Sequence, residues 1–275
     1  AVLIPKAGKS DYSSPRSFRP ISLTSFLFKG LERVVAWHLE EIGVVDALSP
    51  CQHAFRKGKT TATCLSEAVD TIEASILRGK HALGVFFDIE GAFDNVLTSK
   101  VLEGLEVKGV PKDIIEWYGN YLTHRSVQVS IGNTTRCRSL TRGTPQGGIL
   151  SPLVWNIVFD SLLEGLAAIP GIKPLGYADD GMFLVTGICP QTLLDLAQPA
   201  IDMAVEWGKD NGLVFSCKKT QVILFNRKNN FKVEGNLHIQ GSKIPFSEEV
   251  TYLGLTLNRK LNWNTHVINK IKKCK

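Results

Sequence analysis

The sequence lacks the features that define several common classes of protein. It has no apolar run near the roughly 18 residues that cross a bilayer, and it has no signal-peptide pattern at its start. It has no Cys-x-x-Cys pair and no histidine pair at zinc-ligand spacing. It has no internal repeat and no low-complexity segment. These absences argue against a transmembrane protein, a zinc knuckle and a repeat protein.

The cysteines are few and far apart, which argues against a disulfide framework. We expect all six to be reduced and mostly buried, as in an intracellular protein; they are Cys51, Cys64, Cys137, Cys189, Cys217 and Cys274. The chain starts without an initiator methionine and stops inside a predicted basic helix. We therefore expect it to be a fragment of a longer polypeptide.

The composition is that of a globular protein. With 275 residues and 44% hydrophobic content, the chain can bury a large core as one domain or as two intimate subdomains. The 32 Lys and Arg exceed the 26 Asp and Glu, which gives a net charge of +6. This excess is a weak indication of a polyanionic partner such as nucleic acid.

The stretch Leu175-Gly-Tyr-Ala-Asp-Asp-Gly-Met-Phe-Leu-Val185 predicts a β-hairpin with Asp180-Gly181 at its tip, because Asp-Gly favours tight turns. Two adjacent carboxylates, Asp179 and Asp180, then lie on the turn. Like charges at that distance favour a bound cation, although most isolated Asp-Asp-Gly tripeptides are solvated turns. The hairpin alone leaves both interpretations open.

A third carboxylate ends a predicted buried strand. Residues 82–89 are almost continuously apolar, and Asp88 lies at their end. A carboxylate in such surroundings costs several kcal/mol unless it is paired or binds metal. After a sharp turn, Phe93 follows five residues beyond Asp88, where either a core position or a ligand contact is open to it.

Two further segments have the composition of ligand-binding loops. In residues 142–152, Pro145 blocks a helix, and Gly147 and Gly148 permit close backbone approach beside Gln146. An ordinary helix entry is the alternative, and Gln146 beside paired glycines favours ligand contact. The turn-rich N-terminal loop carries Lys6, Arg16 and Arg19, which suit either a phosphate-binding lid or a solvated surface.

The remaining pattern predicts a mixed fold. Helices are expected at residues 31–41, 61–77, 98–107, 111–122, 153–166 and 193–207, and strands at residues 2–5, 82–89, 126–131, 134–140, 175–178, 182–185, 221–225 and 250–257. This order favours a split βαβ palm. If the two carboxylate-bearing strands are adjacent, Asp88, Asp179 and Asp180 converge, as phosphoryl transfer assisted by two Mg²⁺ ions requires.

Four ordered blocks carry a family resemblance. They are Phe-Arg-Pro-Ile-Ser-Leu at 18–23, Phe-Phe-Asp-Ile-Glu-Gly-Ala-Phe-Asp at 86–94, Gly-Thr-Pro-Gln-Gly-Gly-Ile-Leu-Ser-Pro at 143–152 and Tyr-Ala-Asp-Asp at 177–180. The array resembles the reverse transcriptases, and among them those of non-LTR (LINE-type) retrotransposons. The resemblance extends to Tyr252-Leu253-Gly254 and so covers nearly all of the chain.

The resemblance implies an α+β right-hand polymerase fold, with fingers and a palm whose antiparallel, ferredoxin-like sheet packs on helices. It implies fingers at 1–81, palm at 82–122, a hairpin insertion at 123–140, palm at 141–257, and the start of a thumb or connector at 258–275. The implied activity is that of an RNA-directed DNA polymerase which adds dNTPs to a primer 3′-hydroxyl.

The resemblance also implies roles for particular residues. Asp88, Asp179 and Asp180 would bind two Mg²⁺ ions, for which Mn²⁺ could substitute, and the Ile89 carbonyl would add a ligand. Lys219 would protonate pyrophosphate. The dNTP would contact Lys6, Arg19, Ile89, Phe93, Gln146 and Gly147, and Tyr252, Leu253 and Gly254 would form the primer grip.

The expected partners are an RNA template, a DNA primer, dNTPs, and flanking endonuclease and thumb regions of a parent polyprotein, with no membrane. The expected location is intracellular, in the nucleus or a cytoplasmic ribonucleoprotein. Two alternatives stay open: a group II intron-type reverse transcriptase or maturase, and a domesticated, noncatalytic RNA-binding scaffold.

Overall fold

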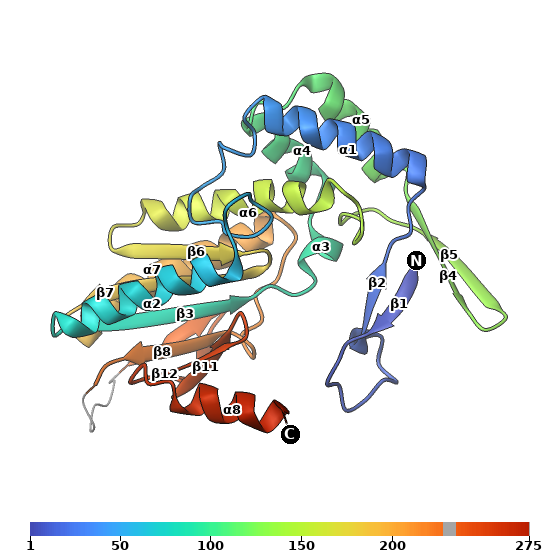
Figure 1. The fold of residues 1–275 in the computed structure, drawn as a ribbon. Coiled ribbons are helices and arrows are strands. Elements are labelled where there is room, and N and C mark those ends of the chain that lie inside the picture. Colours follow the sequence, from blue (N-terminus) through green and yellow to red (C-terminus); the bar gives the residue numbers. More distant parts are fainter. Residues whose placement is uncertain (228–234, 275) are drawn as a thin grey trace. The chain divides into compact units, whose positions relative to one another are not determined.

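The computed structural model describes residues 1–227 and 235–274, which form two compact units (Figure 1). Unit 1 comprises Ala1–Leu48 and Gly91–Val158, and unit 2 comprises Ser49–Glu90 and Phe159–Lys275. The predicted division into fingers, palm and connector is a finer assignment and stays a prediction.

Unit 1 combines helices with two small antiparallel hairpins. Its elements are β1 (Val2–Pro5), a 3₁₀ turn (Pro15–Ser17), β2 (Phe18–Ile21), α1 (Phe26–Glu41), α3 (Ala92–Asn95), α4 (Thr98–Val107), α5 (Lys112–Thr123), β4 (Ser126–Ile131) and β5 (Thr134–Ser139). Helix α6 (Ser151–Ala168) begins in unit 1 and ends in unit 2.

Unit 2 contains the central sheet. Its other elements are α2 (Thr61–Leu77), β3 (His81–Asp88), β6 (Ile172–Tyr177), β7 (Asp180–Gly187), α7 (Pro190–Asp210), β8 (Gln221–Phe225), β9 (Leu237–Ile239), β10 (Ser242–Ile244), β11 (Glu249–Tyr252), β12 (Leu255–Asn258) and α8 (Asn264–Cys274). The predicted bounds of α2, α4 and β8 agree with the structure.

The sheet is antiparallel, with strand order β6-β7-β3-β8. Strand β3 is central and is buried along its whole length except at Asp88, as its continuous apolar run predicts. Because side chains alternate along a strand, Phe86 and Phe87 lie on opposite faces. The α+β class and the antiparallel sheet are confirmed.

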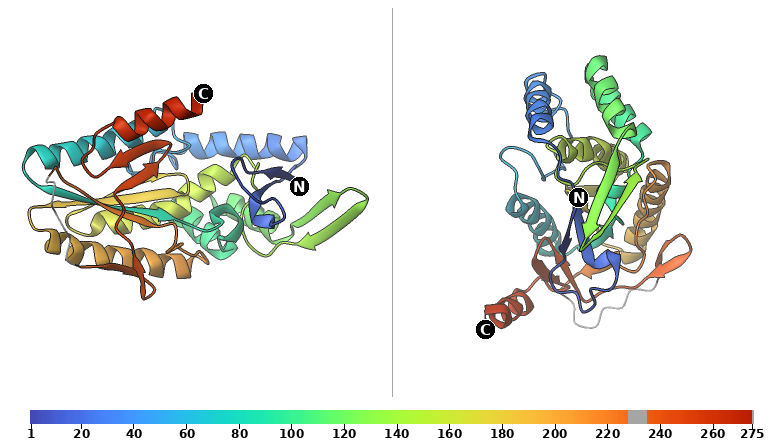
Figure 2. Two further views of the ribbon diagram at one scale, coloured as in Figure 1. Left: turned by 90° about the horizontal axis from the view of Figure 1, so that it is seen from below. Right: turned by 90° about the vertical axis from the view of Figure 1, so that its right-hand side faces the viewer.

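Each face of the sheet is covered by other elements of unit 2 (Figures 1 and 2). On one face, α2 and the β11–β12 hairpin enclose Phe86 together with Cys64, Ile72 and Tyr252. On the other face, Phe87 contacts Phe183 at 5.5 Å and Phe215 at 5.3 Å between ring centroids. The two layers remove apolar side chains on both sides of the sheet from water, which stabilises this unit through the hydrophobic effect.

The β6–β7 turn differs from the sequence prediction in its position. Tyr177 pairs with Asp180, so the two-residue turn is Ala178-Asp179, not Asp180-Gly181. Ala178 takes the positive φ of 57° that a tight hairpin turn needs, and Gly181 lies inside β7 opposite Gly176. The physical reason is packing: a Cβ at Gly176 would lie 2.8 Å from the Phe159 ring.

The last predicted strand, residues 250–257, is in fact a hairpin. Strands β11 and β12 pair antiparallel, and Tyr252 lies opposite Leu255. The turn residues Leu253 and Gly254 have φ values of 47° and 81°. Two successive positive φ values are the geometry of a tight two-residue hairpin turn, which the glycine permits.

Helix α1 is less buried than its periodicity predicts. Leu31 and Val34, on the expected apolar face, are exposed, as is Trp37 at 61%. Leu39, on the same face, is buried, and the ring of Phe28 lies 4.2 Å from that of Tyr121 on α5. The helix also carries the buried Glu32, and the pKa of this carboxyl is raised by desolvation despite hydrogen bonds from the chain at the start of α6.

The six cysteines are free, as expected, but the prediction that most are buried is wrong. Cys64 is buried on α2, whereas Cys137, Cys189 and Cys274 are exposed and the other two are intermediate. Among the described residues, no helix is both long and apolar enough to span a bilayer.

Gly176→Ala should destabilise the protein by about 1 to 3 kcal/mol, because the added methyl group overpacks a rigid site. The methyl would meet Phe159 at 2.8 Å and Leu163 at 3.1 Å. Urea denaturation followed by circular dichroism measures the change. Gly30→Ala is the matched control, since no atom lies within 4 Å of its added Cβ in α1. Equal stability of the Gly176→Ala variant and the wild type would contradict the packing role.

Candidate active site

Three carboxylates gather at one end of the β3–β7 ladder. Asp88 ends β3 and lies directly opposite Asp180, which starts β7, and Asp179 occupies the adjoining turn. Partial desolvation raises the pKa of Asp180 to about 6, and the negative charges of Asp179 and Asp88 add to the rise. The structure thus brings together the three aspartates that the sequence singled out.

Lys219, the predicted proton donor, lies against Asp88. Its Nζ atom is 2.9 Å from Asp88 Oδ2. The loop before β8 is tied to the same strand end, because the Ser216 N–H donates to the Asp88 carbonyl at 2.9 Å. Ile89 forms an antiparallel bridge with Phe215, which fixes the backbone that follows Asp88.

The predicted primer-grip segment lies beside the carboxylate turn. Tyr252 is 5% exposed, and its hydroxyl donates to the Asp180 carbonyl at 3.5 Å and lies 3.6 Å from Cys64 Sγ. Its ring also contacts Phe86, with centroids 5.3 Å apart. The Tyr252 side chain therefore packs in the core of unit 2, and Leu253 and Gly254 form the turn.

Gln146, the predicted nucleotide-pocket residue, is held by a residue that the sequence analysis did not identify. Its Nε2 donates to both carboxylate oxygens of Asp94, at 2.8 and 2.9 Å. The backbone alongside is also bound: Thr144 N–H donates to the Phe93 carbonyl at 2.7 Å, and Ser22 N–H donates to the Gln146 carbonyl at 2.7 Å. The only indication of this role in the sequence is that Asp94 directly follows Phe93.

The same residues border a pocket of about 220 Å³ in unit 1. Asp94, Gln146, Ser22 and Arg142 are among its lining residues. Phe93, which directly precedes Asp94, is half-buried and contacts Trp155, with the ring centroids 5.5 Å apart. A backbone held on both sides and a small, mostly apolar pocket with a few polar side chains in its lining suit the binding of a small ligand.

Gly147, Lys6 and Arg19 also lie in unit 1. Gly147 has a φ of 109°, and a Cβ there would lie 2.9 Å from the Ser22 carbonyl, so only glycine fits. Arg19 is exposed on β2 opposite Ile4, and Lys6 follows β1 with its N–H bonded to the Ser17 carbonyl at 2.8 Å. Both cations belong to the β1–β2 hairpin and its connecting loop.

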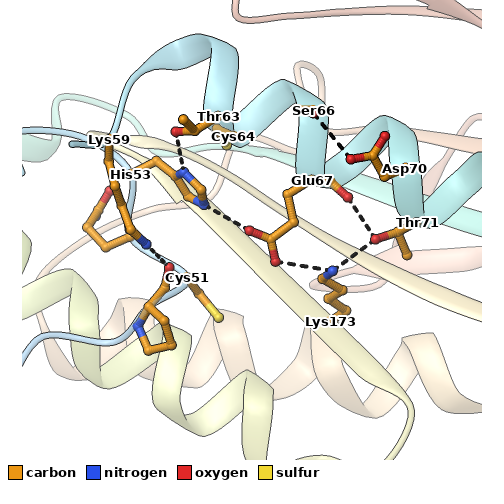
Figure 3. A network of polar contacts seen from close by, with 12 residues as sticks. Cys51, His53, Lys59, Thr63, Cys64, Ser66, Glu67, Asp70, Thr71 and Lys173 are labelled. Carbon is orange, nitrogen blue, oxygen red and sulfur yellow. Dashed lines mark hydrogen bonds and ion pairs between the residues drawn. The ribbon is translucent and has the colours of Figure 1, made fainter.

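A polar network that sequence analysis missed joins α2 to β6 (Figure 3). The buried His53 ring lies 2.9 Å from Thr63 Oγ1 through Nδ1 and 3.3 Å from Glu67 Oε2 through Nε2. Glu67 Oε1 is 3.1 Å from Lys173 Nζ. Burial lowers the pKa of His53, and the positive charge of Lys59 lowers it further.

This network supports the strand that leads into the carboxylate turn. The backbone N–H of His53 donates to the Gly176 carbonyl, and the backbone N–H of Gly176 donates to the Cys51 carbonyl, both at 2.8 Å. Gln52 thereby forms a parallel bridge with Gly176 at the edge of the sheet. Gly176, three positions before Asp179, thus pairs with the segment around Gln52 on one side and with Gly181 of β7 on the other.

The aspartates fit a hard cation by the chemistry of their oxygen donors. Among the described residues, no group of three or more His, Cys, Asp or Glu could hold an ion by itself. Mg²⁺ usually takes only one or two protein carboxylates, with substrate phosphates and water as its other ligands. Desolvation contributes most to the raised pKa of Asp180, and the negative charges of Asp179 and Asp88 add the repulsion that a bound cation would relieve.

An antiparallel sheet with helices on its faces, and with aspartates at the end of its central strand pair, is typical of the palm of right-hand polymerases. Solved telomerase structures from Candida tropicalis share the fold. One, in complex with a fragment of telomeric RNA, aligns with a TM-score of 0.57 and 15% identity over 84% of this chain and 36% of its own. A second, the apo enzyme truncated from its C-terminal domain, has a TM-score of 0.56 and 14% identity over 86% and 44%.

Residues 4–257 match the family described as reverse transcriptase (RNA-dependent DNA polymerase), and the chain belongs to this family. Such enzymes generally use divalent metal ions.

The relatives are non-LTR retrotransposon proteins, which confirms the resemblance seen in the motifs. The chain is 29% identical to a putative 115 kDa protein of type-1 retrotransposable element R1DM from Drosophila melanogaster, over 97% of this chain and 25% of the relative. It is 26% identical to the RNA-directed DNA polymerase of mobile element jockey from the same fly, over 98% and 30%. It is 32% identical to the R2 Pol polyprotein of Popillia japonica, over 71% and 29%. The chain thus spans only a quarter to a third of these relatives.

Acid should destabilise the protein through His53. The folded protein keeps this ring neutral below its usual pKa of 6.5, so the unfolded chain binds more protons and the free energy of unfolding falls as the pH drops below 6.5. The loss is about 1.4 kcal/mol for each tenfold difference in proton affinity between the two states. His53→Gln should flatten this dependence, measured by urea denaturation across pH, whereas His124→Gln, on an exposed site, should not. Parallel curves for wild type and His53→Gln would refute the assignment.

Proposed function

We propose that this chain is the polymerase domain of a non-LTR retrotransposon polyprotein, and that it adds dNTPs to a primer 3′-hydroxyl on an RNA template. The observation that carries the proposal is the facing pair Asp88 and Asp180, with Asp179 in the turn beside them. Two strand ends and a two-residue turn form a rigid support, which is what catalysis by positioning requires.

The three aspartates would hold the catalytic Mg²⁺ ions, and Ile89 would offer its backbone carbonyl. When bound, the two ions supply charge stabilisation for the attacking, transferring and leaving oxygens. Lys219, whose ammonium lies 2.9 Å from Asp88 Oδ2, would neutralise one carboxylate and would give a proton to departing pyrophosphate. In the resting protein its charge partly offsets the repulsion among the aspartates.

The residues of unit 1 would select and orient the nucleotide. Nε2 of Gln146 donates both hydrogen bonds to the carboxylate of Asp94. These bonds fix the orientation of the amide group and therefore the direction of its Oε1 atom. Gly147 lets the backbone approach a ligand closely. Phe93 would lie under the sugar, and Lys6 and Arg19 would bind the triphosphate through charge-assisted hydrogen bonds.

The wider assignments are proposals of the same kind. We propose RNA template, DNA primer and dNTPs as substrates, and endonuclease and thumb regions of the parent polyprotein as neighbours of an intracellular enzyme. The non-LTR identity of the relatives favours this function over a group II intron maturase. The paired aspartates and the oriented Gln146 favour it over a noncatalytic RNA-binding scaffold.

Asp179→Asn should lower primer extension on poly(rA)/oligo(dT) with Mg²⁺ by a factor of at least about 100, comparable to the loss of one preorganised charge-stabilising group. The substitution keeps the side-chain volume and removes the charge. The matched control is Asp195→Asn, on the exposed side of α7 in the same unit. Both variants should keep the wild-type melting temperature within a few degrees.

Substantial extension by a folded Asp179→Asn protein would overturn the metal-binding assignment. Loss of extension in the Asp195→Asn control as well would point to a general effect of altered charge on the assay instead.

Phe93→Val should relax the choice between sugars, because a smaller side chain leaves room for a 2′-hydroxyl. We expect the ratio of kcat/KM for dNTP over rNTP to fall by about tenfold or more, which corresponds to about 1.4 kcal/mol of lost discrimination. Phe28→Val, in the aromatic cluster between α1 and α5, is the control for general loss of aromatic packing in unit 1. An unchanged ratio in an active Phe93→Val enzyme would assign Phe93 to the core beside Trp155.

A further inference from the structure

The β4–β5 hairpin is an extended element with almost no buried surface. All six residues of β5 are exposed, and in β4 only Val127 and Val129 are partly covered. In Figures 1 and 2 the hairpin extends away from the helices of unit 1. The alternation of Val127, Val129 and Ile131 is typical of an inward apolar row, yet Ile131 is 68% exposed. Core packing therefore does not explain this hairpin.

The two faces of the hairpin differ in chemistry. Directly opposed residues share a face, and Arg136 lies opposite Val129 while Arg138 lies opposite Val127. The two arginines are therefore on one face, about 7 Å apart along the strand. The other face is uncharged, and its Ser130 and Thr135 hydroxyls are 2.8 Å apart.

The charge around these arginines is uncompensated. No Asp or Glu occurs in the sequence between Glu116 and Asp160. Within the described parts of the chain, neither Arg136 nor Arg138 makes an ion pair or a side-chain hydrogen bond. Two free guanidinium groups on one exposed strand are a surface that a polyanion would complement.

The root of the hairpin is anchored. Arg125, just before β4, donates from Nη2 to the carbonyls of Arg142 at 3.2 Å and Gly143 at 2.5 Å, and from Nε to the Leu122 carbonyl at 3.2 Å. The Leu140 N–H returns a bond to the Arg125 carbonyl at 2.9 Å. Arg125 thus has a structural role, and the arm is presented on a fixed base.

We propose that the Arg136 and Arg138 face of the β4–β5 hairpin binds the phosphate backbone of RNA or DNA. Each guanidinium can bind a phosphate through two parallel hydrogen bonds, and Val127 and Val129, opposite the arginines on β4, offer an apolar surface to the sugars. A phosphate contact of this kind does not distinguish one nucleotide sequence from another. This inference rests on the proposed function and deepens it, because it assigns a surface that holds the phosphates of the template or primer, and it can fail while the chain remains an active polymerase.

The test compares two variants that remove equal charge. Arg136→Thr/Arg138→Thr and the control Lys112→Gln/Lys209→Gln each lose two positive charges and change the net charge from +6 to +4. Threonine keeps the strand propensity. Both control lysines lie on helices and pair with a glutamate on the same helix, Glu116 at 3.9 Å and Glu206 at 2.8 Å.

Binding is measured by fluorescence anisotropy of a labelled RNA template annealed to a DNA primer, across a salt series. The plot of log Kd against log salt should lose about 1 to 2 units of slope in the arginine variant, since each phosphate contact contributes about 0.7 to 0.9. Arg136→Lys/Arg138→Lys should keep most of the slope, because a point charge still releases counterions. Asp179→Asn should leave it unchanged, which separates this proposal from the catalytic one.

A wild-type slope in the arginine variant would overturn the proposal and leave a protein partner as the occupant of this surface. An equal loss of slope in the lysine control would also overturn it, because net charge alone would then account for the effect.

Discussion

Repulsion among three carboxylates at one end of an apolar ladder is the constraint on which unit 2 depends. Asp88 and Asp180 face each other across β3 and β7, where the rest of the pairing is almost wholly buried and apolar. Such a pair would separate in a flexible loop. Here the interior strand pairing holds them in register, and Lys219 compensates part of the charge. Stability elsewhere in the sheet therefore maintains an unfavourable local arrangement at the site.

The turn between β6 and β7 is shaped by what packs under it. Gly176 and Gly181 lie opposite each other over Phe159, where even one methyl group would clash. The turn that follows places Ala178 at a positive φ, which is uncommon for a residue with a Cβ. Strained backbone of this kind persists where its surroundings determine it, and it concentrates at functional sites.

Unit 1 is organised by backbone bonds between two distant segments. Gly143 N–H donates to the Val96 carbonyl at 2.8 Å and Thr144 N–H to the Phe93 carbonyl at 2.7 Å. A Cβ at Gly143 would lie 2.5 Å from the Asp94 carbonyl oxygen, so the approach requires glycine. The buried Glu32 then accepts hydrogen bonds from the chain that starts α6. A nucleotide pocket built here would inherit this rigidity.

Features that depend on neighbours in the chain could be predicted from the sequence. The buried strand β3, the helix α2 with its Thr60 cap, and the order of the carboxylate motifs all follow from local periodicity, capping and composition. The residues that form the carboxylate turn could not be predicted this way, because the register depends on how Gly176 and Gly181 pack against the distant Phe159. Likewise, the pairing of Gln146 with Asp94 and of His53 with Glu67 depends on contacts between distant segments, and no local pattern encodes such contacts.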